Sequence, residues 1–130
     1  MAETGTVVRD YVEACNASDL ERVVALLHPD VELHEATNLP GAVSAVGLPA
    51  VRRYLERFGS HWSSFKWEPL ELRVDAERAM MLARLHLRGR ESGVVVHREW
   101  FYVFSVREGK LFRQDGYDDR ASAERAFAGE

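Results

Sequence analysis

The longest apolar run in the chain is VVVHREWFYVFSV, residues 94–106. Most of these thirteen residues are β-branched or aromatic, so the run predicts a β-strand, which at about 3.3 Å per residue would be roughly 40 Å long. Large apolar side chains occur in both alternating phases: Trp100 and Tyr102 in the even phase, Phe101 and Val103 in the odd phase. A strand that is apolar on both faces is central, so we expect the sheet and any pocket to be built around it.

The length and charge of the chain restrict the protein classes to consider. A chain of 130 residues fits one domain, residues 1–130, that can bury its own core. The net charge of −4 argues against general binding to nucleic acid or to an anionic membrane. The N-terminus lacks a signal-peptide pattern, and no run of eighteen apolar residues is present. Cys15 is the single cysteine and is expected to be a small core residue without a disulfide, as in a reducing compartment. We therefore expect a cytoplasmic protein.

Apolar periodicity predicts helices first and strands afterwards. Spacings of three and four indicate a first helix, a second helix capped by Ser18 or Asp19 and stopped by Pro29, and a third helix that starts near Pro49. Strands with short turns between them follow, and Asp119 can cap a final helix. The expected elements are helices at 6–15, 20–27 and 49–58, strands at 31–35, 66–74, 79–88, 94–106 and 111–117, and a helix at 119–127.

The short strand at 31–35 carries the most informative acidic residue. Val31 and Leu33 alternate with Glu32 and His34, so Glu35 points in the same direction as the apolar pair. The segment that follows, residues 36–47, contains Pro40-Gly41 and Gly47 and is predicted to be a loop that forms a rim or lid. A carboxyl group is therefore expected at the edge of the core.

This order of elements predicts the α+β class. There is no regular alternation of strand and helix, which a parallel sheet would need. We expect three N-terminal helices packed on a strongly curved, mainly antiparallel sheet, followed by a short C-terminal helix. The curvature is expected because so long a strand must bend or bulge to stay within one compact domain.

Five short motifs occur in order along the chain: Tyr11-Val12-Glu13-Ala14, Ser18-Asp19-Leu20, His28-Pro29-Asp30-Val31, Gly109-Lys110-Leu111 and Tyr117-Asp118-Asp119-Arg120. Taken together, they resemble the SnoaL-like branch of the NTF2-like superfamily. The resemblance covers nearly the whole chain and implies a conical α+β fold with a deep pocket between sheet and helices. The superfamily includes ketosteroid isomerases, polyketide cyclases and many proteins without an assigned activity, so fold alone does not decide the function.

The resemblance to ketosteroid isomerases also implies site residues. In that family an oxyanion-hole tyrosine on the first helix precedes the general-base aspartate by twenty-four residues, and Tyr11 and Glu35 have this separation. The third position falls on the long strand, at Tyr102 if one residue is allowed for a shorter turn, or at Phe101 without it. A glutamate in place of aspartate moves the carboxylate by about an ångström, which matters in a tuned site. For cyclases, the implied histidine and aspartate positions hold Tyr102 and Gly116.

The enzymatic hypothesis is proton transfer next to a carbonyl group. Glu35 would be the base, with its pKa raised by desolvation, and Tyr11 and Tyr102 would donate hydrogen bonds to the enolate oxygen. The alternative is that Tyr11 is only a core aromatic residue and Glu35 is solvated. We expect a small hydrophobic molecule as ligand, bound by a largely aromatic wall. The residues predicted to bind it are Trp62, Trp100, Phe104, Phe112, Gln114, Tyr54 and Phe58.

The histidines are weaker candidates. His86 and His97 flank a predicted hairpin with Glu99 nearby, but no familiar zinc spacing is present, so we expect no metal and no cofactor. Arg84 is expected to pair with Glu99 on the same outer face. The rival function is a non-catalytic binding or interaction module. The resemblance implies a homodimer formed through the odd-phase residues of the long strand, such as Phe101 and Val103.

Overall fold

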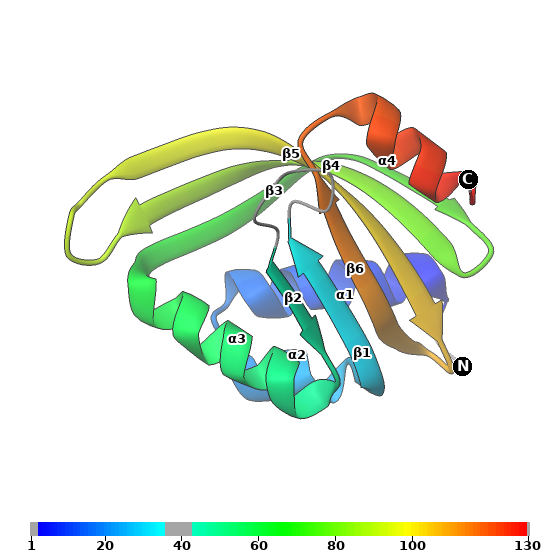
Figure 1. The fold of residues 1–130 in the computed structure, drawn as a ribbon, viewed down its shortest axis with the longest axis horizontal. Coiled ribbons are helices and arrows are strands. Elements are labelled where there is room, and N and C mark those ends of the chain that lie inside the picture. Colours follow the sequence, from blue (N-terminus) through cyan, green and yellow to red (C-terminus); the bar gives the residue numbers. More distant parts are fainter. Residues whose placement is uncertain (1–2, 36–42, 130) are drawn as a thin grey trace.

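A computed structural model describes residues 3–35 and 43–129 of the chain (Figure 1). These residues form four helices and six strands, and none of the helices is long and apolar enough to cross a membrane. In chain order the elements are α1 (Thr4–Asn16), α2 (Leu20–Ala25), β1 (Leu27–Glu35), β2 (Val43–Val46), α3 (Leu48–His61), β3 (Trp62–Asp75), β4 (Arg78–Gly89), β5 (Val95–Arg107), β6 (Lys110–Tyr117) and α4 (Arg120–Phe127).

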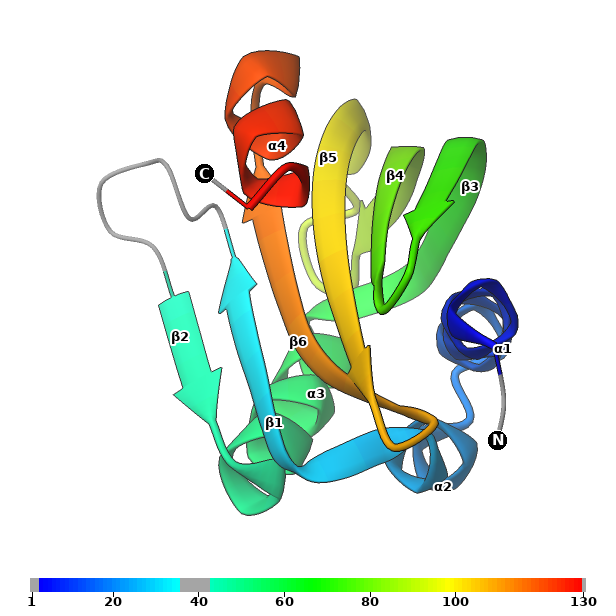
Figure 2. The same ribbon diagram turned by 90° about the vertical axis from the view of Figure 1, so that its right-hand side faces the viewer.

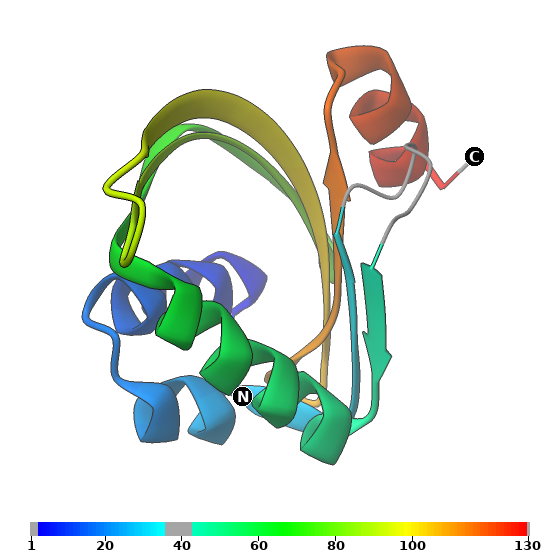
Figure 3. The same ribbon diagram turned by 60° about the vertical axis from the view of Figure 1, so that its left-hand side comes forward.

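The six strands form one open, mixed sheet in the order β2-β1-β6-β5-β4-β3, which Figure 2 shows side by side. Strands β1 and β6 run parallel, and all other neighbours are antiparallel. Figure 3 shows that β3, β4 and β5 bend into an arch, with α1, α2 and α3 on its concave side and α4 on its outer side. The α+β class and the curved, mainly antiparallel sheet are therefore confirmed.

Strand β5 uses its two faces differently. In the even phase, Trp100, Tyr102 and Phe104 are buried in the main core, on the concave side. In the odd phase, Val103 is only 6% exposed because it packs under α4, and Phe101 packs against the same small cluster. The expectation that Val103 belongs to a free surface for a second subunit is wrong, because α4 of the same chain covers it, whereas Phe101 is only half-buried. The homodimer itself stays a prediction.

Several boundaries differ from the sequence-based expectation; for example, α3 ends at His61 and β3 begins at Trp62, and two further differences concern β1 and its neighbours. Residues 43–46 form strand β2, antiparallel to β1, where a loop was predicted; the rest of that predicted lid, residues 36–42, lies outside the described residues. Strand β1 starts at Leu27, so Pro29 lies within a strand instead of ending α2. The β1–β6 register shifts between Leu27 and Glu32, which places Pro29 where the hydrogen-bond ladder is irregular.

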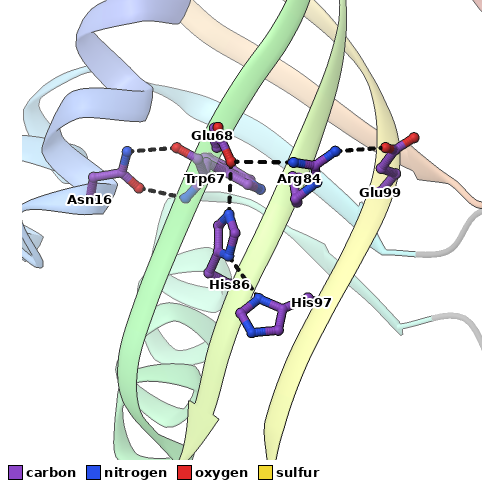
Figure 4. A network of polar contacts seen from close by, with 7 residues as sticks. All are labelled: Asn16, Trp67, Glu68, Arg84, His86, His97 and Glu99. Atoms are coloured by element: carbon purple, nitrogen blue, oxygen red, sulfur yellow. Dashed lines mark hydrogen bonds and ion pairs between the residues drawn. The ribbon is translucent and has the colours of Figure 1, made fainter.

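Helix α1 is attached to the edge strand β3 by one amide side chain. Asn16 Oδ1 accepts a hydrogen bond from the Trp67 backbone N–H at 2.8 Å, and Asn16 Nδ2 donates to the Trp67 carbonyl at 2.9 Å (Figure 4). These two bonds replace the missing strand neighbour at this point of the free edge. Further along, Pro69 and a register shift between Pro69 and Glu71 interrupt the same edge. The Asn16 side chain, called the Asn16 cap below, thus protects the edge of β3 and positions α1 under the arch.

We expect Asn16→Ala to lower the free energy of unfolding by about 2 kcal/mol, because two hydrogen bonds are lost and two partly buried backbone groups lose their partner. Urea unfolding followed by circular dichroism measures the change. Thr6→Ala, an exposed position on the same helix, is the control and should change stability by less than about 0.5 kcal/mol. Equal stability of the two variants would contradict the role of the Asn16 cap.

Candidate functional site

A cavity of about 680 Å³ lies between the concave face of the sheet and the helices α1, α2 and α3. Its wall is mostly apolar and aromatic, and its size suits a ligand of two or three rings. Residues that line it include Leu33, Tyr54, Phe58, Trp62, Phe65, Trp67, Leu85, Val96 and Trp100. The polar groups at the deep end of this wall come from α1, β1, β5 and β6.

Glu35 brings a carboxyl group into this apolar wall. It is the last residue of β1 and lies in the same phase as Val31 and Leu33, which are both buried. The side chain is half-buried and lines the cavity, and its burial raises the pKa of the carboxyl group to about 7. Glu35 therefore exchanges a proton near neutral pH. The alternating pattern of the strand predicted that Glu35 points inward and that its pKa is raised, but not by how much.

Gln114 connects Glu35 to the first helix. Tyr11 Oη donates to Gln114 Oε1 at 2.8 Å, and Gln114 Nε2 donates to Glu35 Oε1 at 3.4 Å. Because the phenol can only donate to the amide oxygen, it sets the orientation of the amide and directs an N–H at the carboxyl group. The Tyr11 proton is thus directed at Gln114 and not into the cavity. Tyr11 and Gln114 are each only 1% exposed.

Tyr102 has its hydroxyl group in a different arrangement. Trp67 Nε1 donates to Tyr102 Oη at 3.0 Å, and the two rings meet edge to face with their centroids 5.1 Å apart. Among the described residues, no acceptor takes the proton of Tyr102. Burial, reinforced by the charge of Glu35, raises the pKa of Tyr102 well above its ordinary value. This phenol therefore stays protonated and has a hydrogen bond to offer to a ligand.

The structure brings most of the predicted site residues together. Eight of them line the same cavity: Glu35, Tyr11, Tyr102, Trp62, Trp100, Gln114, Tyr54 and Phe58. Desolvation by burial raises the pKa of Tyr11, Tyr54 and Tyr102, and the charge of Glu35 adds to it in each case. Their roles toward a ligand stay predictions.

Phe104 and Phe112 are placed elsewhere. Phe104 is fully buried, with its ring edge-on to Tyr11 at 6.1 Å, so it supports the wall from behind. Phe112 lies at a bulge, since Ser105 pairs with Arg113 but the next residue of β5 pairs with Leu111. The extra residue reverses the side-chain phase of β6. Phe112 consequently lies under the Arg107 guanidinium instead of facing the cavity. The Arg107 Cζ atom is 3.7 Å from the centroid of the Phe112 ring.

Sequence reasoning missed two contributions to the site. Trp67 acts as hydrogen-bond donor to Tyr102, a pairing across 35 residues that leaves no local signal. Arg98 lines the cavity from the apolar phase of β5. A charged residue within that phase was a visible signal, because the neighbouring positions of the phase, Val96 and Trp100, are apolar.

The histidine pair lies on the outer face of the sheet, away from the cavity (Figure 4). His86 Nδ1 and His97 Nδ1 are 2.8 Å apart, and His86 Nε2 lies 2.9 Å from Glu68 Oε1. Arg84 pairs with Glu99 at 3.2 Å, as predicted. Within the part of the chain that is described, no three His, Cys, Asp or Glu residues form a group that could hold a metal ion. The network links β3, β4 and β5 at the surface.

Comparison with known proteins identifies similar chains. The profile of the SnoaL-like domain family matches residues 8–114. An NTF2-like protein of unknown function from Burkholderia pseudomallei K96243 is 21% identical, with a TM-score of 0.79 and 98% of each chain covered. No match is found among curated protein sequences.

Two further solved structures have the same fold. A Sinorhizobium meliloti protein proposed to be a polyketide cyclase is 24% identical, with a TM-score of 0.68 and coverage of 85% of this chain and 93% of that one. A Catenulispora acidiphila protein with a ketosteroid isomerase-like fold, in complex with trimethylamine, is 11% identical, with a TM-score of 0.77 and coverage of 97% and 94%. At these identities the likeness establishes the fold alone.

The raised pKa of Glu35 predicts a specific pH dependence of stability. The folded state holds this proton up to about pH 7 and the unfolded state only up to about pH 4.5, so its contribution is complete below pH 4.5 and is lost as the pH rises through 7. The loss amounts to about 3 kcal/mol. Relative to the wild type, Glu35→Gln should gain this amount in free energy of unfolding between pH 4 and 8, measured by urea titration. Parallel pH profiles of the two proteins would contradict the buried carboxyl group.

Proposed function

The chain belongs to the SnoaL-like domain family, and on this premise we propose that it binds a small hydrophobic carbonyl compound and transfers a proton next to the carbonyl group. The observation that carries the proposal is the pairing of two groups in one apolar cavity: the carboxyl group of Glu35, whose pKa is about 7, and the Tyr102 phenol, which has a proton to donate. A base with this pKa is efficient at neutral pH, because it is partly ionised and still strongly basic.

The proton transfer needs only these two groups. Ionised Glu35 takes the proton from the carbon next to the carbonyl; the electron pair of that C–H bond forms the C=C bond of the enolate, and the π pair of the carbonyl moves onto its oxygen. Tyr102 donates a hydrogen bond to the enolate oxygen that results, in surroundings where apolar walls strengthen the interaction. The hydrogen bond from the Trp67 indole N–H to Tyr102 Oη makes the phenol a stronger donor, because hydrogen bonds in a chain polarise one another. Return of the proton to the same or another carbon completes exchange or isomerisation.

Tyr11 and Gln114 position the base in this scheme. The sequence-based hypothesis placed Tyr11 beside Tyr102 as a second donor to the oxyanion, but its proton is directed at Gln114 Oε1. Gln114 in turn donates to Glu35. We assign Tyr11 and Gln114 to holding the carboxyl group in place, and Tyr102 alone to the enolate oxygen.

The β5–β6 register favours isomerase-like over cyclase-like chemistry. Tyr102 lies directly opposite Gly116, the two positions where the cyclase resemblance implies histidine and aspartate. With a phenol and no side chain there, that acid–base pair is missing. The alternative function is binding of the same class of ligand without turnover, and it is distinguished by the exchange experiment that follows.

We expect the protein to catalyse exchange of the methyl-ketone protons of 2-acetylnaphthalene in D₂O, followed by proton NMR. Glu35→Gln should lower the exchange rate by about 100-fold or more, because the base is lost. Glu32→Gln removes a carboxyl group from the same strand at a position that does not line the cavity, so it should leave the rate unchanged. Binding of the ketone without exchange by the wild type would establish the non-catalytic alternative.

The two tyrosines should separate by their pH–rate profiles. Tyr102→Phe should lower the plateau rate about 100-fold, because the oxyanion donor is lost. In Tyr11→Phe the Gln114 amide loses its orientation, and the Glu35 carboxylate loses part of its hydrogen bonding. The midpoint of the profile should therefore move to higher pH while the plateau changes less than in Tyr102→Phe. Identical profiles for both variants would contradict these separate roles.

A further inference from the structure

Arg98 interrupts the apolar face of β5. The residues of this phase are Val96, Arg98, Trp100, Tyr102, Phe104 and Val106, and Arg98 is the one charged residue among them. It lines the cavity and is exposed, whereas Trp100 beside it is 7% exposed. Arg98 therefore lies on the solvent side of the cavity wall, and Tyr102 lies on the protein side.

Stacking fixes the guanidinium group on this wall. The Arg98 Cζ atom is 4.2 Å from the ring centroid of Trp100. A guanidinium that stacks on an indole keeps its N–H groups directed outward in its own plane, and this planar fork matches the two oxygens of a carboxylate. Arg98 is thus held against the cavity with its hydrogen-bonding edge available.

The acidic residues around the cavity already have other partners. The Asp19 side chain accepts from the Arg22 N–H at the start of α2, and Glu56 lies 3.8 Å from Arg52. Glu35, at the deep end, has its pKa raised to about 7 by burial and is largely neutral below that pH. None of these carboxyl groups forms an ion pair with Arg98 in the described part of the chain.

A second arginine adds positive charge to the same cavity. Arg90 lines it and donates from Nη2 to the carbonyl oxygens of Gly59, at 3.2 Å, and of Trp62, at 3.3 Å. These partners are neutral, so they satisfy hydrogen bonds without cancelling the charge. Across the described residues, neither Arg90 nor Arg98 forms an ion pair with a carboxylate. Two guanidinium groups without a carboxylate partner in the described part of the chain thus lie on the cavity wall, together with the carboxylates of Asp19 and Glu56. Arg98 lies at the open side of the cavity, and Glu35 lies at the deep end.

From this asymmetry we infer that the ligand is an apolar keto acid, whose carboxylate binds Arg98 while its carbonyl group reaches Tyr102 and Glu35. This inference rests on the proposed function for the carbonyl end. The Cα atoms of Arg98 and Tyr102 are four residues apart on one face, about 13 Å along the strand, and Trp100 lies between them, so a rigid apolar body should separate the two groups of the ligand. An aromatic body of this length fits the wall formed by Trp62, Trp67 and Trp100.

The test uses a matched pair of probes, 6-acetyl-2-naphthoate and its methyl ester, which share the same ring system and acetyl group and differ at one end by the charge and a methyl group. Quenching of tryptophan fluorescence gives the dissociation constants. The wild type should bind the acid about tenfold more tightly than the ester, and the preference should shrink in high salt. Arg98→Gln should abolish the preference by weakening the acid only, and Arg98→Lys should retain part of it. Arg88→Gln, on the outer face of the neighbouring strand β4, should retain all of it.

Equal affinity of the wild type for the two probes would overturn the inference, as would equal weakening of both by Arg98→Gln, which would reduce Arg98 to a packing residue. Binding of neither probe would overturn both this inference and the proposed function. Proton exchange at the acetyl group separates the two. An acid preference that depends on Arg98 without exchange keeps the anion site and removes the base role of Glu35, whereas exchange without the preference does the reverse.

Discussion

The hydrogen bond from Tyr11 to Gln114 joins the first helix to the last strand, across 103 positions in the chain, in a place that solvent does not reach. A buried amide and phenol are costly without partners, so each requires the other to be in place. This mutual requirement holds α1 under the arch of the sheet and gives the deep end of the cavity a defined polar surface. The position of Glu35 depends on this hydrogen bond. Because Tyr11 holds the Gln114 amide oxygen, the amide N–H of Gln114 is directed at the Glu35 carboxyl group.

The polar groups at the deep end of the cavity, which belong to Glu35, Tyr11, Gln114 and Tyr102, are surrounded by a mostly apolar wall. Burial keeps the phenols protonated and raises the pKa of Glu35 to about 7, so a group that would be an ordinary surface carboxylate in water becomes a base poised near neutral pH. The same burial makes ionised Glu35 unfavourable for stability above neutral pH. The site thus combines a stability cost with chemical capacity, a combination that is typical of functional positions and untypical of plain core.

Strand β5 shows how far a one-dimensional pattern reaches. Its apolar length and two-sided character predicted a central strand whose even phase, including Trp100 and Tyr102, faces the pocket, and the structure agrees. The pattern could not say what covers the other phase, because α4 covers Val103 only after β6 has paired with β5 and turned the chain back over the outer face. The bulge at Phe112 was equally invisible, since alternation assumes a regular ladder and one extra residue reverses the phase.

The sequence alone determined the α+β class, the order of the elements apart from β2, the cap at Asp119 and the inward direction of Glu35, because capping and alternation are local properties that neighbouring residues decide. For the cap of α2 it left Ser18 and Asp19 as alternatives, and the structure has Asp19. The charged Arg98 within an apolar phase was visible in the sequence, but its place on the cavity wall was recognised only in the structure. Only the tertiary structure decided which groups meet: Tyr11 with Gln114, Trp67 with Tyr102, and Arg98 with an open side that lacks a carboxylate partner among the described residues. These pairings depend on how the sheet curves around the helices, and that curvature results from the packing of the whole chain.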